Sequence, residues 1–293
     1  MSPPMTEEQF RRANDRPRTR RLRKGIYLLP SLFTSLNMAL GYYALYHAIQ
    51  GSAAEPWHYD NAAKAIGFAI IFDGLDGRIA RMTNTTSDFG REFDSLADVV
   101  TFGVAPAILA WLWGFRLFGS INGGDLTARI AQMGAIASFA FLIAGASRLA
   151  RFNIQVNPQP SNPGRPGRKY FVGMPIPAGA GVIAAVVHFT DGAPIAAWWM
   201  GLIWAALVFV TGYLMISTWR FYSFKDIDFR SKHPFWVVVV IGVLIACVRY
   251  FSEYFLFFLA LFYMLSGVFA RLMYILRRRG SSPPPPLEAT TAR

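Results

Sequence analysis

Four aspartates in one short stretch are the residues of this chain best suited to chemistry. Asp73 and Asp76 follow the apolar run Ala65–Phe72, and Asp94 and Asp98 come shortly after. A carboxylate on a membrane helix costs roughly 2.5–3.5 kcal/mol on insertion scales. Such a group of carboxylates therefore needs something that neutralises it, and a pair of divalent cations is suited to that role.

The spacing of the aspartates places them in two pairs. An α-helix turns by about 100° per residue, so Asp73 and Asp76 lie within about 60° of each other on one helix face. Asp94 and Asp98, four residues apart, lie within about 40°. We expect the first pair near the end of one helix and the second pair at the start of the next. A short loop makes these helices antiparallel, so the two pairs can face one cleft.

The ligand types favour a hard cation such as Mg²⁺ or Mn²⁺, which prefers oxygen ligands. Cys247, the only cysteine, lies in an apolar run and excludes both an intrachain disulfide and a cysteine-based zinc site. The histidines fall in no common cluster, and we expect no chemistry from them. They are His47, His58, His188 and His233.

Small and basic residues lie among the carboxylates. Gly74 and Gly77 bracket Asp76, and small side chains let a ligand approach the backbone closely. Arg81 can pair with a phosphate. Carboxylates, metal and arginine together suggest chemistry on a pyrophosphate linkage, where two metals can stabilise both the attacking and the leaving oxygen.

The elements that must position these residues are membrane helices. The chain has 293 residues, of which 54% are hydrophobic, and a net charge of +12. A membrane helix needs roughly 20 mainly apolar residues. We expect an all-α polytopic membrane protein with about eight transmembrane helices. They are Tyr27–Ile49, Asn61–Met82, Leu96–Gly119, Ala131–Ala150, Met174–Thr190, Ala196–Ser217, Pro234–Phe251 and Tyr254–Leu276.

Lysine and arginine mark every second loop. They are abundant in the N-terminal tail, in 82–95, 151–170 and 220–233, and after 276, whereas the loops 50–60 and 191–194 have none. By the positive-inside rule, both termini and the aspartates face the cytosol. These basic residues lie beside apolar stretches, so they indicate topology and anionic lipid as the partner, not nucleic acid.

We divide the chain into four parts. Residues 1–24 form a cytosolic basic tail, 25–220 a catalytic transmembrane core, 221–279 two additional transmembrane helices, and 280–293 a disordered tail. No segment resembles a cleavable signal. The arginine-rich ends suit a bacterial inner membrane.

The aspartate stretch resembles the signature of the CDP-alcohol phosphatidyltransferase family. That signature is Asp-x2-Asp-Gly-x2-Ala-Arg-x8-Gly-x3-Asp-x3-Asp, and every fixed position matches. The matching residues are Asp73, Asp76, Gly77, Ala80, Arg81, Gly90, Asp94 and Asp98. The resemblance implies a six-helix core and transfer of a phosphatidyl group from a CDP-linked lipid to an alcohol, with release of CMP.

The resemblance also implies roles for individual residues. Two divalent cations would be held by Asp73, Asp76, Asp94 and Asp98, and Asp98 would also be the general base. The CDP-lipid would contact residues of the motif, of its spacer and of the first helix. These are Thr34, Asn37, Gly77, Ala80, Arg81, Ser87 and Gly90. The family further suggests a homodimer.

The acceptor alcohol is indicated by four longer stretches that look like the phosphatidylserine synthase branch. These stretches are Leu29–Asn37, Asp88–Ala107, Arg148–Asn153 and Phe171–Ala178. The branch implies CDP-diacylglycerol and L-serine as substrates. Because serine carries a carboxylate, its pocket should offer a cation, and we expect Arg148 and Arg151 to supply it, with a hydrogen bond from Asn153. For both arginines, topology alone is the simpler explanation.

Other functions remain open at this stage. Within the family, the acceptor could be glycerol 3-phosphate, inositol phosphate or choline. A membrane prenyltransferase would also use aspartates and Mg²⁺, but it predicts a second aspartate-rich pair much further along the chain, and none follows Asp98. A cation transporter would need charged or broken helices in both halves. For the aspartates themselves, the simplest alternative is a set of capping and surface carboxylates.

Overall fold

The computed structural model describes residues 18–83, 88–116, 124–154, 170–223 and 234–278, and nearly all of them are helical. The α-helices are α2 (Arg18–Gln50), α3 (Trp57–Thr83), α4 (Asp88–Asp98), α5 (Ala105–Trp111), α7 (Asp125–Ile154), α8 (Ile176–Phe189), α9 (Trp198–Ile216) and α10 (Pro234–Arg278). The π-helical segments η1 (Val99–Val104) and η2 (Leu112–Arg116) flank α5. Two short strands, β1 (Tyr170–Val172) and β2 (Arg220–Tyr222), complete the described elements.

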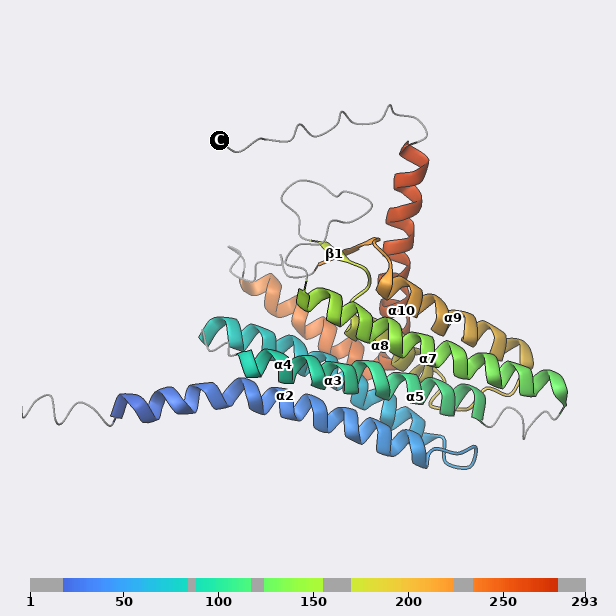
Figure 1. Ribbon diagram of the computed structural model, residues 1–293, viewed down its shortest axis with the longest axis horizontal. Helices are drawn as coiled ribbons and strands as arrows, with labels where there is room; N and C mark the ends of the chain where they lie inside the picture. Colours follow the sequence, from blue (N-terminus) through green and yellow to red (C-terminus); the bar gives the residue numbers. More distant parts are fainter. Residues whose placement is uncertain (1–17, 84–87, 117–123, 155–169, 224–233, 279–293) are drawn as a thin grey trace, which may run out of the picture.

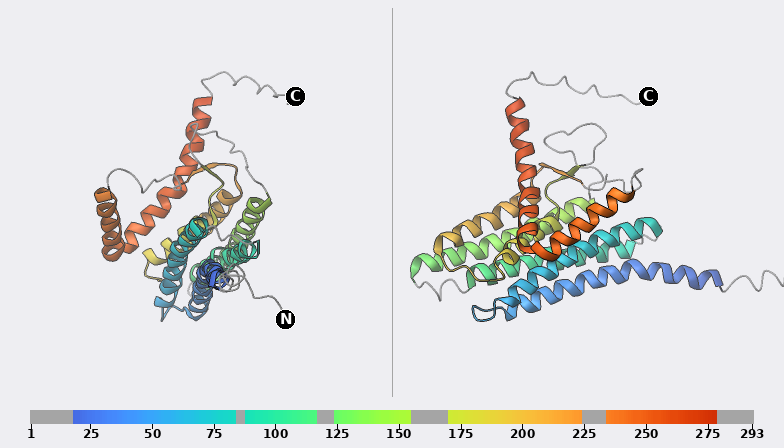
Figure 2. Two further views of the ribbon diagram at one scale, coloured as in Figure 1. Left: turned by 90° about the vertical axis from the view of Figure 1, so that its left-hand side faces the viewer. Right: turned by 180° about the vertical axis from the view of Figure 1, so that it is seen from behind.

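The helices form one bundle in which neighbours in space are not always neighbours in sequence. Helix α2 packs along α3, and α7 packs along α9. Helix α8 lies against both α3 and α10, so it joins the first part of the chain to the last (Figure 1). The C-terminal end of α10 projects beyond the other helices (Figure 2).

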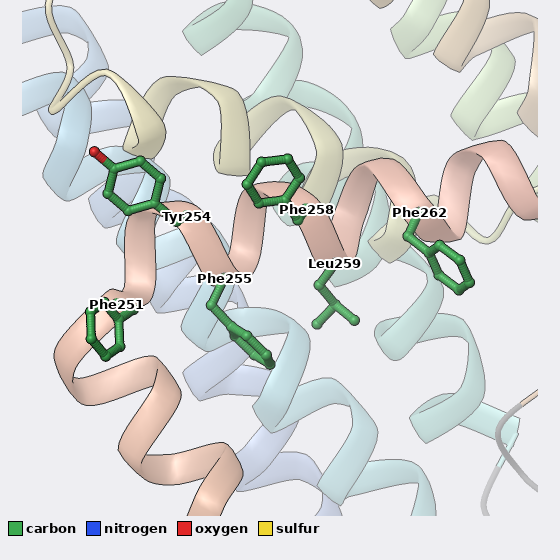
Figure 3. Close-up of a pocket in the computed structure, with 6 residues that line it drawn as sticks. All are labelled: Phe251, Tyr254, Phe255, Phe258, Leu259 and Phe262. Carbon is green, nitrogen blue, oxygen red and sulfur yellow. The ribbon is translucent and has the colours of Figure 1, made fainter.

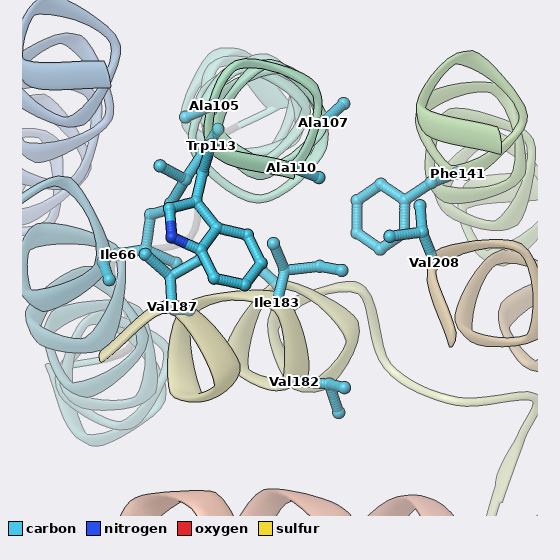
Figure 4. Packing of buried hydrophobic residues seen from close by; sticks show 14 of the residues in the cluster. Ile66, Ala105, Ala107, Ala110, Trp113, Phe141, Val182, Ile183, Val187 and Val208 are labelled. Atoms are coloured by element: carbon cyan, nitrogen blue, oxygen red, sulfur yellow. The ribbon is translucent and has the colours of Figure 1, made fainter. Parts of the chain in front are cut away.

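The core of the bundle is filled by side chains from at least five elements. Trp113 of η2 lies among Ile66 of α3 and Ile183 and Val187 of α8 (Figure 4). The Trp113 indole also donates a hydrogen bond of 2.9 Å to the carbonyl of Ala193, so its polar atom is satisfied inside the bundle. Burial of these apolar groups fixes α3, α5 and α8 relative to one another.

By length and composition, four helical stretches of the described chain could span a membrane. They are Phe89–Arg116, Asp125–Ile154, Trp198–Ile216 and Gly242–Arg277. The 14-residue helix Ile176–Phe189 is apolar but shorter. These helices make the chain an integral membrane protein, as predicted, while the count of eight spans stays a prediction.

Several predicted boundaries differ from the structure. Helix α2 begins at Arg18, inside the segment predicted as a basic tail, and α4 begins at Asp88 instead of Leu96. The two helices predicted over Pro234–Phe251 and Tyr254–Leu276 form one element, α10, which breaks at Phe251 with φ −137° and ψ 34°. Apolar runs locate helices well, but polar residues such as those of 88–95 also continue a helix when tertiary contacts support it.

The two strands are an addition to the predicted all-α fold. β1 and β2 pair antiparallel, with Phe171 opposite Phe221. Gly173, directly after β1, adopts φ +73°, and its N–H donates to the carbonyl of Trp219 at 2.8 Å. A Cβ atom here would lie 2.4 Å from the carbonyl oxygen of Met215, so this turn requires glycine. The strands thereby tie the start of α8 to the end of α9.

Candidate active site

Three of the four predicted aspartates come together at one end of the bundle. Asp73 lies on α3, and Asp94 and Asp98 lie on α4. Each offers a carboxylate oxygen, and these oxygens lie within 4.8 Å of one another. All three side chains are half-buried, which leaves the cluster open on one side. The antiparallel arrangement of the two aspartate-bearing helices was predicted from their short connection, and it explains how distant sequence positions converge.

Several predicted site residues cannot be placed in this cluster. The side chains of Asp76, Gly77, Ala80 and Arg81 lie outside the described residues, as does Ser87 entirely. The backbone of the first four continues α3 beyond Asp73. Their roles stay predictions.

Asn37 of α2 connects the first helix to the cluster. Its side-chain amide donates a long hydrogen bond of 3.4 Å to Asp98 Oδ1. Asn37 is 1% exposed, and its own Oδ1 has no partner among the described residues. A buried amide oxygen without a partner is costly. That atom is therefore an available acceptor at the edge of the cluster.

The π-helical segment η1 starts directly after Asp98. Its contacts explain how α2 comes so close to the aspartate cluster. Thr101 of η1 donates a hydrogen bond of 3.1 Å to the main-chain carbonyl of Asn37. At Gly41, one turn further along α2, an added Cβ would lie 2.4 Å from Thr101 Oγ1. Because π-helical turns are rare and recur at functional sites, this segment marks the same region as the aspartates.

Thr34 and Gly90 lie on the two helices that carry Asn37 and Asp94. Thr34 is buried on α2, three residues before Asn37 and so on the same face. Gly90 is half-buried in the first turn of α4. Both positions are compatible with the predicted contact to a ligand, which stays a prediction.

Arg148 of α7 carries a buried positive charge beside the cluster. The residue is 8% exposed, and its Nε has no hydrogen-bond partner among the described residues. Tyr263, Arg151 and Asp98 lie within electrostatic reach of its guanidinium. A buried guanidinium is stable only with compensating anions or acceptors, and an incoming anion would add one.

The other two residues of the predicted acceptor pocket have different surroundings. Arg151 donates a hydrogen bond of 3.2 Å to the carbonyl of Ile216, at the end of α9. Asn153 donates one of 3.0 Å to Ser95 Oγ on α4, next to Asp94. Arg148 is therefore the buried one of the two arginines, while Arg151 holds two helices together.

Sequence reasoning missed three neighbours of the site. Thr101 holds the helix turn that contains Asn37. Ser95 fixes Asn153, and Tyr263 of α10 lies near Arg148. Ser95 and Thr101 follow Asp94 and Asp98 closely, which was a usable signal. Nothing in the sequence connects Tyr263 with residue 148.

This donor set fits a hard divalent cation. Three carboxylates provide oxygen ligands and negative charge, and no cysteine or histidine is found in the cluster within the described part of the chain. A cation bound there could also bind phosphate oxygens, since such cations in protein sites are commonly shared between carboxylates and substrate phosphates. The arrangement thus suits transfer at a phosphorus atom, with Arg148 available for a second anionic group.

Comparisons with known proteins agree with transfer chemistry at a phosphorus atom. The sequence profile of the CDP-alcohol phosphatidyltransferase family matches residues 27–212, which include the cluster and end before β2 and α10. A Helicobacter pylori protein named CDP-diacylglycerol–serine O-phosphatidyltransferase is 36% identical over 230 residues, which cover 76% of this chain and 83% of that protein. A protein of the same name from Methanocaldococcus jannaschii is 34% identical over 209 residues, covering 71% of this chain and 83% of its own length.

The cluster predicts a specific response of stability to a divalent cation. We expect Mn²⁺ to raise the apparent melting temperature of the detergent-solubilised protein, since a ligand at 100 times its Kd stabilises by about 2.7 kcal/mol. The melting temperature of Asp94→Asn should rise much less when Mn²⁺ is added. In EDTA this variant should be at least as stable as the unmodified protein, because one of three like charges is removed.

Thermal unfolding followed over a Mn²⁺ titration measures both effects. Asp125→Asn is the matched control, since Asp125 is an exposed carboxylate on α7 whose partner is Arg129. The assignment would be contradicted if the melting temperature of the unmodified protein did not change with Mn²⁺. It would also be contradicted if Mn²⁺ raised the melting temperature of Asp94→Asn as much as that of the control.

Proposed function

Because the chain belongs to the CDP-alcohol phosphatidyltransferase family, we propose that it transfers the phosphatidyl group of CDP-diacylglycerol to the hydroxyl of L-serine. The products are phosphatidylserine and CMP. The names of relatives with 36% and 34% identity support serine as the acceptor. The observation that carries the proposal is the cluster of three carboxylates with a buried guanidinium in electrostatic reach of Asp98.

We assign the aspartates to two divalent cations, Mg²⁺ or Mn²⁺. Asp73, Asp94 and Asp98 would hold them together with Asp76, the fourth aspartate of the family signature. When bound, such cations neutralise charge on the phosphates of the CDP-lipid and on the departing CMP. The residues of the chain then have to bind, orient and deprotonate the acceptor.

Asp98 is the base that receives the proton of the serine hydroxyl. An ordinary aspartate has a pKa near 4, so it is a weak base at neutral pH. Its main contribution is therefore to position the hydroxyl, and proton transfer comes late in the step. The hydrogen bond from Asn37 limits how the Asp98 carboxylate can rotate.

The CDP group is assigned to the motif residues and the first helix. Gly77, Ala80 and Gly90 would permit close approach of the nucleotide, and Arg81 would pair with a phosphate. Ser87, Thr34 and Asn37 would complete this side of the site. Asn37 is the best supported of these, since its unpartnered buried oxygen can accept a hydrogen bond from the ligand.

Arg148 is assigned to the carboxylate of serine. In serine only two carbon atoms separate the carboxyl carbon from the hydroxyl oxygen. A cation that holds the carboxylate must therefore lie close to the base that faces the hydroxyl, and Arg148 meets that requirement beside Asp98. Asn153 would help indirectly, because its bond to Ser95 fixes α7 against α4.

A phosphorylated acceptor such as glycerol 3-phosphate is the second candidate. The observation in its favour is that Arg148 and Arg151 lie one turn apart on α7, where a dianionic phosphate could engage both. Arg151 already donates one hydrogen bond to the carbonyl of Ile216, which leaves further N–H donors of its guanidinium for such a phosphate.

We further propose the cellular setting. The site and both termini face the cytosol, where serine is available, and the membrane is a bacterial inner membrane. The loop charges support this orientation. The family resemblance supports a homodimer.

The acceptor can be identified by supplying one alcohol at a time. Protein in mixed micelles with CDP-diacylglycerol and Mn²⁺ should release CMP with L-serine and remain at background with glycerol 3-phosphate, inositol phosphate or choline. The Asp98→Asn variant sets the background. Release with glycerol 3-phosphate alone would overturn the serine assignment but leave the family chemistry intact.

The role of Arg148 predicts a selective loss of serine affinity. A hydrogen bond to a charged group is worth about 1.5–3 kcal/mol, so Arg148→Ala should raise the KM for serine by roughly ten- to a hundredfold. The KM for CDP-diacylglycerol should change far less. Steady-state kinetics with each substrate varied in turn separates the two constants.

Arg129→Ala is the control for this variant, because Arg129 is an exposed arginine on the same helix, paired with Asp125. If Arg148→Ala folds and keeps the serine KM of that control, the carboxylate is bound elsewhere.

A further inference from the structure

A second cluster of chemically capable side chains lies at the other end of α3. Asp60 is in the first turn of α3, His188 is near the end of α8, and Ser252 follows the break in α10. Asp60 and Asp73 are 13 positions apart in the sequence, so the two clusters are separated by roughly 20 Å along α3. They therefore form independent sites.

The three side chains are joined by two hydrogen bonds in series. His188 Nδ1 lies 2.5 Å from Asp60 Oδ1, and His188 Nε2 lies 3.0 Å from Ser252 Oγ. A histidine between a carboxylate and a serine hydroxyl is the arrangement in which the histidine accepts the serine proton and the carboxylate orients the ring. The sequence predicted no common cluster of histidines, whereas the structure places His47 Nδ1 2.8 Å from His58 Nδ1. The prediction that the histidines do no chemistry is not tested by these contacts, and chemistry at His188 is the proposal made below.

The environment favours the required protonation states. The side chains of His188 and Asp60 are 7% and 10% exposed. Burial of Asp60 favours its neutral form, but hydrogen bonds and charges from His188 and Lys64 outweigh this and hold the pKa of the carboxyl below its ordinary value. An ionised Asp60 carboxylate can accept a proton from His188 Nδ1, and this contact orients Nε2 of the ring toward the Ser252 hydroxyl.

Ser252 lies at a backbone position suited to a nucleophile. Phe251 has non-helical angles, so a new helical stretch starts around Ser252. The first N–H groups of a helix lack partners within that helix and carry partial positive charge. Ser252 thus stands at the start of a helical stretch.

An apolar groove begins at the residues that flank Ser252. It has a volume of about 540 Å³ and is lined by Phe251, Tyr254, Phe255, Phe258, Leu259 and Phe262 (Figure 3). All six lie on α10, beyond the part of the chain matched by the family profile. A groove lined by five aromatic rings and a leucine suits a hydrocarbon chain.

We propose that Asp60, His188 and Ser252 form a second catalytic site, which hydrolyses carboxylic esters of fatty acids whose acyl chain occupies the groove on α10. Ser252 Oγ attacks the ester carbonyl carbon while its proton passes to His188 Nε2. The bond to the alcohol then breaks, and the alcohol leaves with that proton. Water attacks the acyl-serine, His188 again accepts and returns the proton, and the free acid departs. No oxidant or cofactor is needed.

The test uses the full-length protein in detergent micelles, with a fluorophosphonate probe and p-nitrophenyl octanoate. We expect covalent labelling at Ser252, located by peptide mass spectrometry, and ester hydrolysis that falls at least 100-fold in Ser252→Ala and in His188→Gln. The rate of ester hydrolysis should fall less in Asp60→Asn, because the nucleophile and the base remain.

Two further variants make the result interpretable. Ser266→Ala is the matched control, since Ser266 is another hydroxyl on α10 whose partner is the carbonyl of Tyr263. Asp125→Asn should also keep full esterase activity, because Asp125 is an exposed carboxylate on α7 whose partner is Arg129. Melting temperatures of all variants show whether they fold.

The opposite result is equally clear. If the unmodified protein gives no adduct at Ser252, and folded Ser252→Ala hydrolyses the ester as fast as Ser266→Ala, the proposal is wrong. The hydrogen bonds then serve only to anchor α10 to α3 and α8. Neither outcome depends on the phosphatidyl transfer proposed above.

Discussion

The close approach of Asp73, Asp94 and Asp98 is the constraint on which the site depends. Their oxygens lie within 4.8 Å of one another in an apolar helical protein. Like charges at that distance repel strongly where water is limited, so the arrangement is stable only with a compensating positive charge. Arg148 provides part of that charge, and bound divalent cations would provide the rest.

The bundle is built so that this cluster is reached from several sides. Helix α2 approaches through Asn37, whose carbonyl accepts a hydrogen bond from Thr101 of η1. Helix α7 approaches through the contact of Asn153 with Ser95 and carries the buried Arg148. Helix α10 contributes Tyr263 near Arg148, although it lies outside the family profile. A helix outside the family profile therefore reaches both Arg148, through Tyr263, and the cluster at the other end of α3, through Ser252.

The sequence predicted the local features of the site and not its long-range ones. The pairing of aspartates on helix faces followed from helical periodicity, and the convergence of Asp73 with Asp94 and Asp98 followed from a short antiparallel connection. The contact of Asn37 with Asp98 joins residues 61 positions apart, so spacing could not reveal it. The same holds for Asp60, His188 and Ser252, since each is unremarkable in its own segment. The break at Phe251 was anticipated only as a boundary between two helices.

The central claim is that serine attacks phosphorus directly, with Asp98 and Arg148 holding it beside the cluster. Isotope exchange between labelled CMP and CDP-diacylglycerol tests this claim most directly, with Mn²⁺ present and serine absent. A single displacement requires the acceptor alcohol, so we predict no label in CDP-diacylglycerol until phosphatidylserine is added as well. Rapid exchange without any alcohol or its product would show a phosphatidyl-enzyme intermediate and would contradict the account.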